Sequence, residues 1–216
     1  DVYKRQTVIF AGPPEEDIDW ADVSPGASLK FLQRAWRVAD DVTSDPGVDV
    51  TTGDVALRKT THKMISEITT LVEGQRFNVI VARCMELINA VRKAIDTGCG
   101  ANDPAVREAV TFAAQAMSLF APYVAEDMWE LLGYQPSVAS SSWPTADPAL
   151  LVADEVTMVV QVNGKVRGKI QVSPDVDEDQ ARQLALADAN VKRFVADKNI
   201  VKVIARLPRM LSLVVK

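Results

Sequence analysis

Few residues of this chain have the type and spacing that catalysis needs. His62 is the one histidine among 216 residues, and the sequence places no serine or cysteine nucleophile beside it. Cys84 falls inside a helical pattern and Cys99 in a glycine-flanked loop, so neither a CxxC pair nor a disulfide framework is present. No glycine-rich phosphate loop follows a strand pattern, and no cluster has metal-ligand spacing. The sequence therefore predicts no catalytic residue and no metal site, and we interpret His62 first as a surface or packing residue.

The chemistry that the residue spacing does favour is electrostatic. Lys165, Arg167 and Lys169 recur at every second position, so on a regular strand they share one face over about 13 Å. Cations in such a row can follow a phosphate backbone, and each neutralised phosphate adds to a salt-dependent affinity.

A later segment carries a second set of cations. Lys202 and Arg206 share one face of a predicted strand, and Arg209 follows the turn at Pro208. Aromatic residues are not interleaved with either set, which disfavours stacking on single strands and favours shape and backbone recognition of folded RNA. A solvated sheet face without a ligand explains the same charges equally well, so charge alone leaves both interpretations open.

The net charge of −5 hides a division of the chain into two parts. Residues 1–155 hold 13 Lys and Arg against 23 Asp and Glu, a net charge of −10, whereas residues 156–216 hold 11 against 6, a net charge of +5. The acidic part and the basic tail are therefore interpreted separately.

The basic tail has the pattern of a small mixed domain. After Glu155 apolar residues alternate with polar ones, and Asn163-Gly164 signals a hairpin between strands at 156–162 and 165–172. A two-residue loop would pair Val160 with Arg167, so we predict instead a three-residue loop that pairs Val160 with Val166. A helix from Asp177 to about Ala196 and strands at 200–207 and 211–215 complete a ββαββ order.

The acidic part has the pattern of a helical bundle. Helices are predicted from Ser24, from about Asp54 to Glu73, from an Asn78 cap to near Gly98, and from Asp103 to Leu131 with a kink at Pro122. Leu29, Leu32, Trp36 and Ala39 are expected to face the core in the first of these helices. In the connector that follows, Trp143 and Pro144 are expected to fasten the chain to the bundle.

The predicted fold class is multidomain, α then α+β: an antiparallel-type α-helical bundle followed by a small ββαββ domain. We divide the chain into a lead-in at 1–20, a bundle at 21–133, a connector at 134–154 and a C-terminal domain at 155–216. Residues 1–6 show neither a helix cap nor a clear period, and we interpret the lead-in as truncated and partly non-native. The sequence has neither a signal-peptide pattern nor an apolar run long enough for a bilayer, so a cytoplasmic location is expected.

At the hairpin the sequence resembles a known family. Residues 159–170, VVQVNGKVRGKI, closely resemble the hairpin that opens the C-terminal domain of bacterial leucyl-tRNA synthetases, and residues 202–215 resemble the end of that domain. The bundle is similar to the anticodon-binding-type domain of the same class I enzymes at FLQRAWR (31–37), THK (61–63), RFN (76–78), MEL (85–87), FAP (120–122), Trp129 and Trp143-Pro144. Order and spacing hold over about residues 8–216, without the cysteine-rich zinc modules of isoleucyl enzymes or the coiled coil of valyl enzymes.

The resemblance implies a leucine-tRNA ligase that uses ATP and Mg²⁺ and whose catalytic and editing domains lie upstream in cis. The segment 63–67, KMISE, is only superficially similar to the KMSKS loop, because it lies within a helix and Glu67 replaces a needed cation. We expect this fragment to be inactive alone, to hold no cofactor, to be monomeric without a membrane partner, and to bind tRNA(Leu).

The resemblance also implies tRNA contacts at the basic positions. The candidate residues are Lys165, Arg167, Lys169, Lys202, Arg206 and Arg209. Further candidates, in the bundle, are Arg34, Arg37, His62 and Arg76, and Arg76 serves equally well to hold the turn before Asn78. The main alternative from another class is a stand-alone helical interaction protein with a basic solubilising tail.

Overall fold

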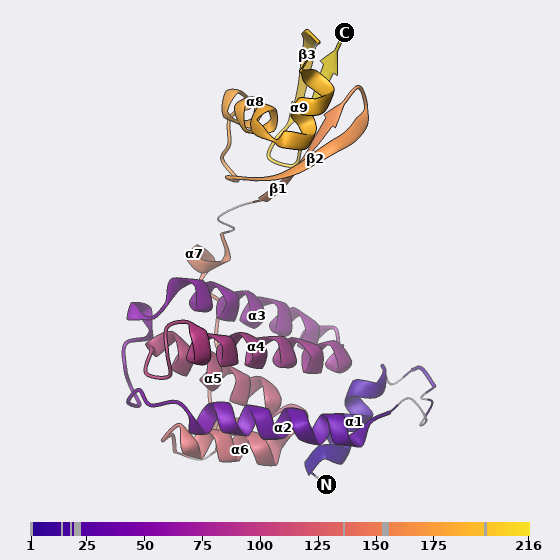
Figure 1. Ribbon diagram of the computed structural model, residues 1–216. Helices are drawn as coiled ribbons and strands as arrows, with labels where there is room; N and C mark the ends of the chain where they lie inside the picture. The colour runs from indigo at the N-terminus through magenta and orange to yellow at the C-terminus, as the bar shows by residue number, and fades with distance from the viewer. Residues whose placement is uncertain are drawn as a thin grey trace. The chain divides into compact units, whose positions relative to one another are not determined.

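The computed structural model describes residues 2–13, 15–17, 19, 23–135, 137–152, 156–196 and 198–216 (Figure 1). The chain forms two compact units, Asp1–Leu151 and Val152–Lys216, which we describe separately.

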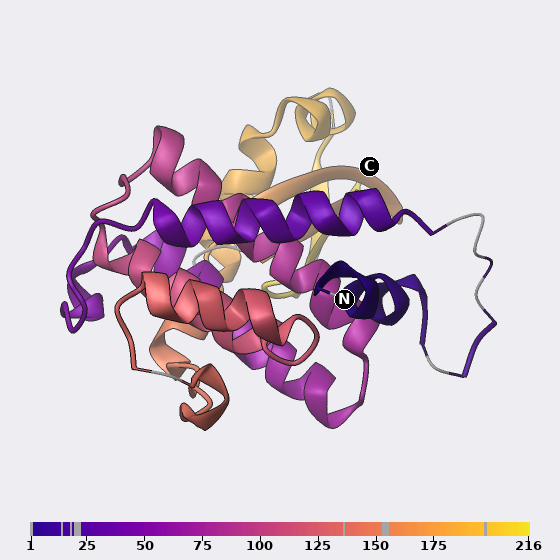
Figure 2. The same ribbon diagram turned by 90° about the horizontal axis from the view of Figure 1, so that it is seen from below.

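The first unit is a helical bundle. Helices α3, α4 and α5 pack against one another, while α2 packs against α6 and α1, and Figure 2 shows α2 running alongside α6. The elements are α1 Val2–Ala11, α2 Pro25–Asp40, η1 Val50–Thr52, α3 Val55–Glu73, α4 Phe77–Thr97, α5 Pro104–Met117, α6 Pro122–Leu131, η2 Val138–Ser140 and α7 Pro148–Leu151.

Local capping explains where most of these helices begin. The side chains of Ser24 and Asp103 accept backbone N–H groups in the first turns of α2 and α5, as predicted, and Asp54, where a helix was expected to begin, caps α3 in the same way. The predicted cap at Asn78 was wrong, because α4 begins at Phe77 and Arg76 takes the cap position without a side-chain hydrogen bond. Arg76 is exposed there.

The predicted kink at Pro122 is instead a complete break. Helix α5 ends at Met117, and α6 begins at Pro122 after a tight turn. Proline has no N–H to donate and disfavours the helical conformation of the residue before it. Ala121 accordingly leaves the helical region, with φ −135° and ψ 59°.

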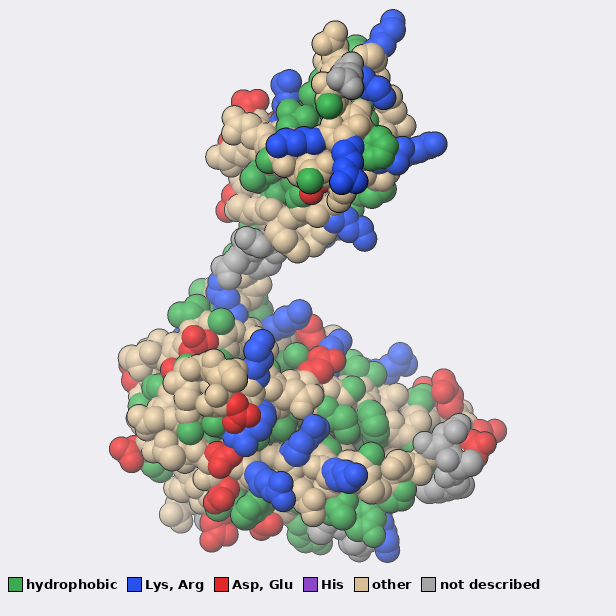
Figure 3. All heavy atoms as spheres, viewed as in Figure 1, with side chains coloured by type: hydrophobic (Ala, Val, Ile, Leu, Met, Phe, Trp, Pro, Cys, Tyr) green, Lys and Arg blue, Asp and Glu red, His purple; other side chains and the backbone are tan. Residues whose placement is uncertain are grey.

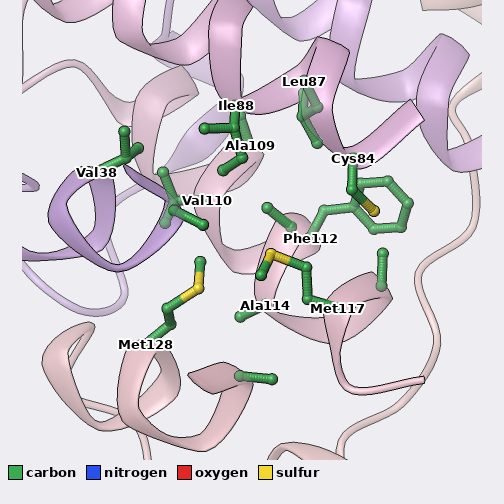
Figure 4. Close-up of a cluster of buried hydrophobic side chains, with 14 of the residues drawn as sticks. Val38, Cys84, Leu87, Ile88, Ala109, Val110, Phe112, Ala114, Met117 and Met128 are labelled. Atoms are coloured by element: carbon green, nitrogen blue, oxygen red, sulfur yellow. The ribbon is translucent and has the colours of Figure 1, made fainter. Parts of the chain in front are cut away.

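The bundle core is formed by apolar side chains from α2 to α6. Figure 4 shows Leu87 and Ile88 of α4, Val110 and Phe112 of α5 and Met128 of α6 pointing toward one another. On α2 the buried stripe is rotated from the prediction. Leu32 and Ala39 are buried as expected, but Leu29 and Trp36 remain 38% and 39% exposed, while Phe31, Ala35 and Val38 face the core.

Helix α1 was not expected from the sequence. It packs against α4 and α2, so tertiary contacts rather than a local cap stabilise it. Gln6 is fully buried in this contact, and neither side-chain polar atom of Gln6 has a hydrogen-bond partner among the described residues.

Replacing Gln6 by leucine is expected to stabilise the first unit by about 1–3 kcal/mol, because a buried amide without a partner loses its hydration uncompensated. Tryptophan fluorescence during thermal unfolding measures the effect, since all four tryptophans lie within residues 1–151. Arg5→Leu on the exposed side of α1 is the control and should leave the midpoint nearly unchanged. A lower midpoint for Gln6→Leu would show that an unseen partner, such as a buried water, satisfies the amide.

The connector is fastened to the bundle at Trp143, as predicted. The indole Nε1 of Trp143 donates to Thr69 Oγ1 at 2.9 Å, and its ring meets Phe112 edge-on at 5.8 Å between centroids. Gln115 Nε2 donates to Ser141 Oγ at 3.0 Å. These contacts keep this part of the connector on the helical unit.

The second unit is a four-stranded mixed sheet with two helices. Its elements are β1 Val156–Val162, β2 Lys165–Val172, α8 Glu178–Ala187, α9 Ala189–Val195, β3 Ile200–Arg206 and β4 Met210–Val215. The strand order is β2-β1-β4-β3, in which β1 and β4 are parallel and the other two pairs are antiparallel. Met158, Val160, Leu211 and Leu213 pack under the two helices, so one sheet face is covered.

Two details of this unit differ from the ββαββ prediction. The single helix expected at 177–196 is divided at Asp188, which ends α8 and whose side chain accepts the N–H groups of Asn190 and Val191 to begin α9. The order of elements is therefore ββααββ. An internal aspartate that caps a new helix explains the division.

The predicted three-residue hairpin loop was also wrong. Asn163 and Gly164 both have positive φ, 49° and 77°, and Val162 pairs with Lys165, as in a two-residue type I′ turn. The register then shifts between Val160 and Gln161, where Arg167 is the extra residue of a β-bulge. This bulge removes the pairing of Val160 with Arg167 that had argued against the short loop.

Candidate nucleic-acid interface

The sheet of the second unit has one face that α8 and α9 do not cover, which we call the open face. Strand registers assign residues to it, because directly paired residues point to the same side. The register joins Lys169 to Val159, Val159 to Met210, and Met210 to Arg206, so these four residues form one row across all four strands. The row therefore has a cation at each end, Lys169 and Arg206, and apolar residues in its middle. Three strand spacings separate the backbones of these two cations, which is roughly 14 Å.

The neighbouring positions complete the open face. Lys202 pairs with Val214 and lies on the same side of β3 as Arg206, as predicted. The other members are Thr157, Gln161, Val166, Gln171, Ile204 and Ser212. Lys169, Lys202 and Arg206 are all exposed.

The bulge divides the three cations of β2, which corrects the prediction that they share one face. Lys165 pairs with Val162 and therefore lies on the helix-covered side, whereas Lys169 lies on the open face. The guanidinium carbon of Arg167 lies 3.8 Å from the ring centroid of Phe194 in α9, a cation–π contact on the covered side. An extra residue in one strand reverses the alternation beyond it, so spacing of two no longer means one face.

Gly168 explains why the bulge is accommodated at this point. A Cβ atom at Gly168 would lie 2.9 Å from Cγ2 of Val191 and 3.2 Å from Oδ1 of Asp188. Only glycine lets the start of α9 approach β2 so closely, and an isolated glycine within a strand pattern was the sequence signal for a bulge.

The cations of the second unit are not neutralised locally. Every ion pair found among the described residues lies in the first unit. Arg209 is exposed in the turn between β3 and β4, where its backbone carbonyl accepts the N–H of Val159. Lysine and arginine side chains spread over the visible side of this unit in Figure 3, so an excess positive charge is available to an anion.

Five further exposed cations of this unit were not singled out from the sequence, the C-terminal Lys216 among them. Arg182 lies on α8, Lys192 and Arg193 on α9, and Lys198 before β3. Lys192 and Arg193 form the basic last turn of α9, where they complement the helix dipole and so have a structural explanation of their own.

His62 has a packing role within the bundle. It is 7% exposed, and its Nδ1 accepts the backbone N–H of Asp147 at 2.8 Å. Nε2 therefore carries the ring proton and donates to Glu108, 3.0 Å away, which also accepts from Arg58 Nε at 3.0 Å. Both ring nitrogens of His62 are engaged within the first unit, which fits the packing interpretation.

The remaining bundle candidates, Arg34 and Arg37, are exposed on α2.

Neither cysteine is suited to thiolate chemistry. Burial raises the pKa of Cys84 to about 12, and partial burial, with the carboxylates of Asp103 and Asp54, raises the pKa of Cys99. Across the described residues there is no group of three His, Cys, Asp or Glu side chains able to hold a metal ion. Among those same residues, no helix has the length and apolar character needed to cross a membrane.

A helical bundle followed by a sheet with an uncovered basic face is an architecture suited to RNA, and comparison with known proteins agrees. Residues 54–182 match the family model described as the anticodon-binding domain of tRNA ligase. The chain belongs to this family.

Individual relatives show which tRNA ligases the chain resembles. The chain is 58% identical over 210 residues to the leucine--tRNA ligase of Paenarthrobacter aurescens, 55% identical over 211 residues to that of a Nocardioides species, and 39% identical over 212 residues to that of Tropheryma whipplei. These matches cover 97–98% of this chain and 25–26% of each relative. The chain thus spans about a quarter of the length of the curated relatives it matches.

A solved structure shares the fold. LeuRS from Agrobacterium radiobacter K84, crystallised as a ternary complex with tRNA and LeuAMS, superposes with a TM-score of 0.77 at 22% identity. The likeness covers 98% of this chain and 28% of that one.

Proposed function

We propose that this chain is the tRNA-binding part of a leucine-tRNA ligase and that it positions tRNA(Leu) for ATP-dependent leucylation. The catalytic and editing domains belong to other parts of that enzyme. Family membership and the leucine--tRNA ligases matched over a quarter of their length support this assignment. The same assignment implies a monomer that works in the cytoplasm.

The observation that carries the proposal is the open face with its unpaired cations. Lys169, Lys202 and Arg206 lie at the two edges of a rigid sheet, where they meet phosphates without first breaking an ion pair. The apolar middle of the row, Val159 and Met210, adds contact area but no specific hydrogen bond. Such a surface reads backbone shape rather than sequence, which suits a folded tRNA.

Basic residues outside the open face contribute a second, smaller set of phosphate contacts. Lys165 and Arg209 lie at exposed turns, and Arg167, which is half-buried, is held over Phe194. On the bundle, Arg34, Arg37 and Arg76 are proposed as separate tRNA contacts, and His62 is not among them.

ATP and Mg²⁺ are required by the parent reaction but do not fit this chain. Across the described residues, neither a three-ligand cluster nor a histidine with a free ring nitrogen is available to them. We therefore assign no chemical step to residues of this chain.

The chain is expected to bind tRNA(Leu) more tightly than other tRNAs in a gel shift at moderate salt. It is expected to form no leucyl-tRNA from ATP, leucine and tRNA. The competing assignment, a helical interaction protein whose basic tail only solubilises it, requires equal retention of all tRNAs. Measured aminoacylation by the chain alone would contradict the proposed division between binding and chemistry.

A further inference from the structure

Helix α2 carries two adjacent stripes on its outer surface. Lys30, Arg34 and Arg37 follow one another at i, i+4 and i+7, and Leu29 and Trp36 lie beside them on the same helix. All five residues are exposed, and α2 has no acidic residue before Asp40. A basic stripe on the acidic part of the chain is not explained by the overall charge.

The three cations of this stripe are free of local partners. Within the described part of the chain, none of Lys30, Arg34 and Arg37 forms an ion pair, whereas Arg58, Arg83 and Arg92 of the same unit all do. Figure 3 shows basic side chains gathered over α2 with hydrophobic side chains beside them.

Trp36 differs from the two other tryptophans that the structure describes. The indole N–H groups of Trp129 and Trp143 donate to Gln135 O and Thr69 Oγ1. Trp36 has no such bond among the described residues and is 39% exposed. Leu29, which is 38% exposed, lines the same groove as Trp36, and contiguous exposed apolar surface of this kind can mark a binding site.

Trp36 forms one wall of a groove of about 540 Å³. Tyr3, Leu29, Leu32 and Val124 supply the other apolar surface, and Gln33 and Arg37 also line the groove. A volume of this size is within the range of small-ligand sites, and the amide of Gln33 has both a donor and an acceptor to offer.

We propose that this groove binds an unpaired nucleobase of the tRNA, stacked on Trp36, with the flanking phosphates on Lys30, Arg34 and Arg37. The proposal rests on the proposed function, because it names a second contact for the same tRNA. Base stacking on an aromatic ring beside cations is a common mode for unpaired nucleotides.

Charge decides between RNA and a protein occupant. An apolar protein surface laid on the groove would remove the water around Arg37 without providing an anion, which is costly. A two-fold dimer through this face would place the basic stripes of the two copies close together. In an RNA complex the phosphates neutralise the cations, and the base packs against the apolar walls of the groove.

The test measures tRNA(Leu) binding by the full chain at several salt concentrations. Trp36→Ala is expected to weaken binding about tenfold with an unchanged salt slope, because stacking is lost and phosphate contacts remain. The triple change Lys30→Gln, Arg34→Gln and Arg37→Gln is expected to weaken binding and flatten the slope. Tyr123→Ala, an aromatic of α6 that is 65% exposed and outside the groove lining, is the matched control. Trp36→Phe should restore most of the affinity.

Nucleotide-resolved chemical probing then identifies the base. One unpaired base protected by the wild-type chain should become reactive with Trp36→Ala, and an abasic tRNA at that nucleotide should lose no further affinity with the variant. Wild-type affinity for Trp36→Ala, with weaker binding by open-face variants, would overturn this inference and leave the proposed function standing. Absence of any tRNA preference in the wild-type chain would overturn both. A dimer that Trp36→Ala dissociates at unchanged tRNA affinity would assign the groove to a second copy.

Discussion

Replacing Lys169, Lys202 and Arg206 together by glutamine is expected to weaken tRNA(Leu) binding about tenfold or more and to flatten its salt dependence. Each lost phosphate contact removes roughly 0.7–0.9 from the slope of log affinity against log salt, so three contacts reduce it by about two or more. The sheet should stay folded, because all three side chains are exposed and lack ion-pair partners among the described residues.

The matched control removes the same charge from the helix-covered side of the same unit. Arg182→Gln, Lys192→Gln and Arg193→Gln change exposed cations on α8 and α9. If the open face binds the tRNA, the control should retain most of the affinity and slope. Equal losses of affinity and salt slope in the two triple variants would mean that net charge alone explains the effect. That result would contradict the assignment of the open face.

Replacing Arg107 by alanine is expected to destabilise the first unit by about 3 kcal/mol. Arg107 is 4% exposed, and its Nη1 donates to Leu132 O at 2.7 Å while its Nε donates to Ser44 Oγ at 3.1 Å. Its Nη2 also donates to the carbonyl of Ser44. Truncation leaves these acceptors buried without a donor and removes the bridge from α5 to the loop after α2 and the end of α6.

Tryptophan fluorescence during heating measures this loss. A change of 3 kcal/mol corresponds to a midpoint lower by roughly 6–12 °C for a unit of this size. Arg92→Ala is the control, because the pair between Arg92 and Asp41 is exposed at the surface and contributes at most about 1 kcal/mol. Similar midpoints for the two variants would mean that other contacts hold the loop at Ser44.

The open face and the groove at Trp36 assign a different part of tRNA binding to each of the two units. The bundle provides three cations along α2, and the second unit provides a basic sheet face with unpaired charges. Binding measurements on Trp36 and open-face variants separate the two contributions, because one depends on stacking and the other on counterion release.

The sequence alone determined the features that depend on neighbouring residues. Ser24, Asp54 and Asp103 begin helices because each side chain reaches an N–H group two or three residues ahead. The change of apolar period after residue 155 located the strands, and the Asn163-Gly164 pair located the hairpin. The family resemblance also came from such local stretches of sequence.

Tertiary structure decided the features that depend on distant residues. The charge of Arg107 favours exposure, yet the side chain is buried because Ser44 and the carbonyl of Leu132 accept its hydrogen bonds. Helix α1 has no local signal and is held by α4 and α2. The two ring nitrogens of His62 form hydrogen bonds with Glu108 and with the backbone of Asp147, which is 85 residues away in the chain.

The division of Lys165, Arg167 and Lys169 between two faces has the same origin. Alternation along a strand is local, but the bulge that reverses it is fitted to α9, whose Val191 lies against Gly168. The sequence thus determined which residues are basic and that they occupy a strand. The packing of α9 on the sheet decided that Lys169, rather than Arg167, joins Lys202 and Arg206 on the open face.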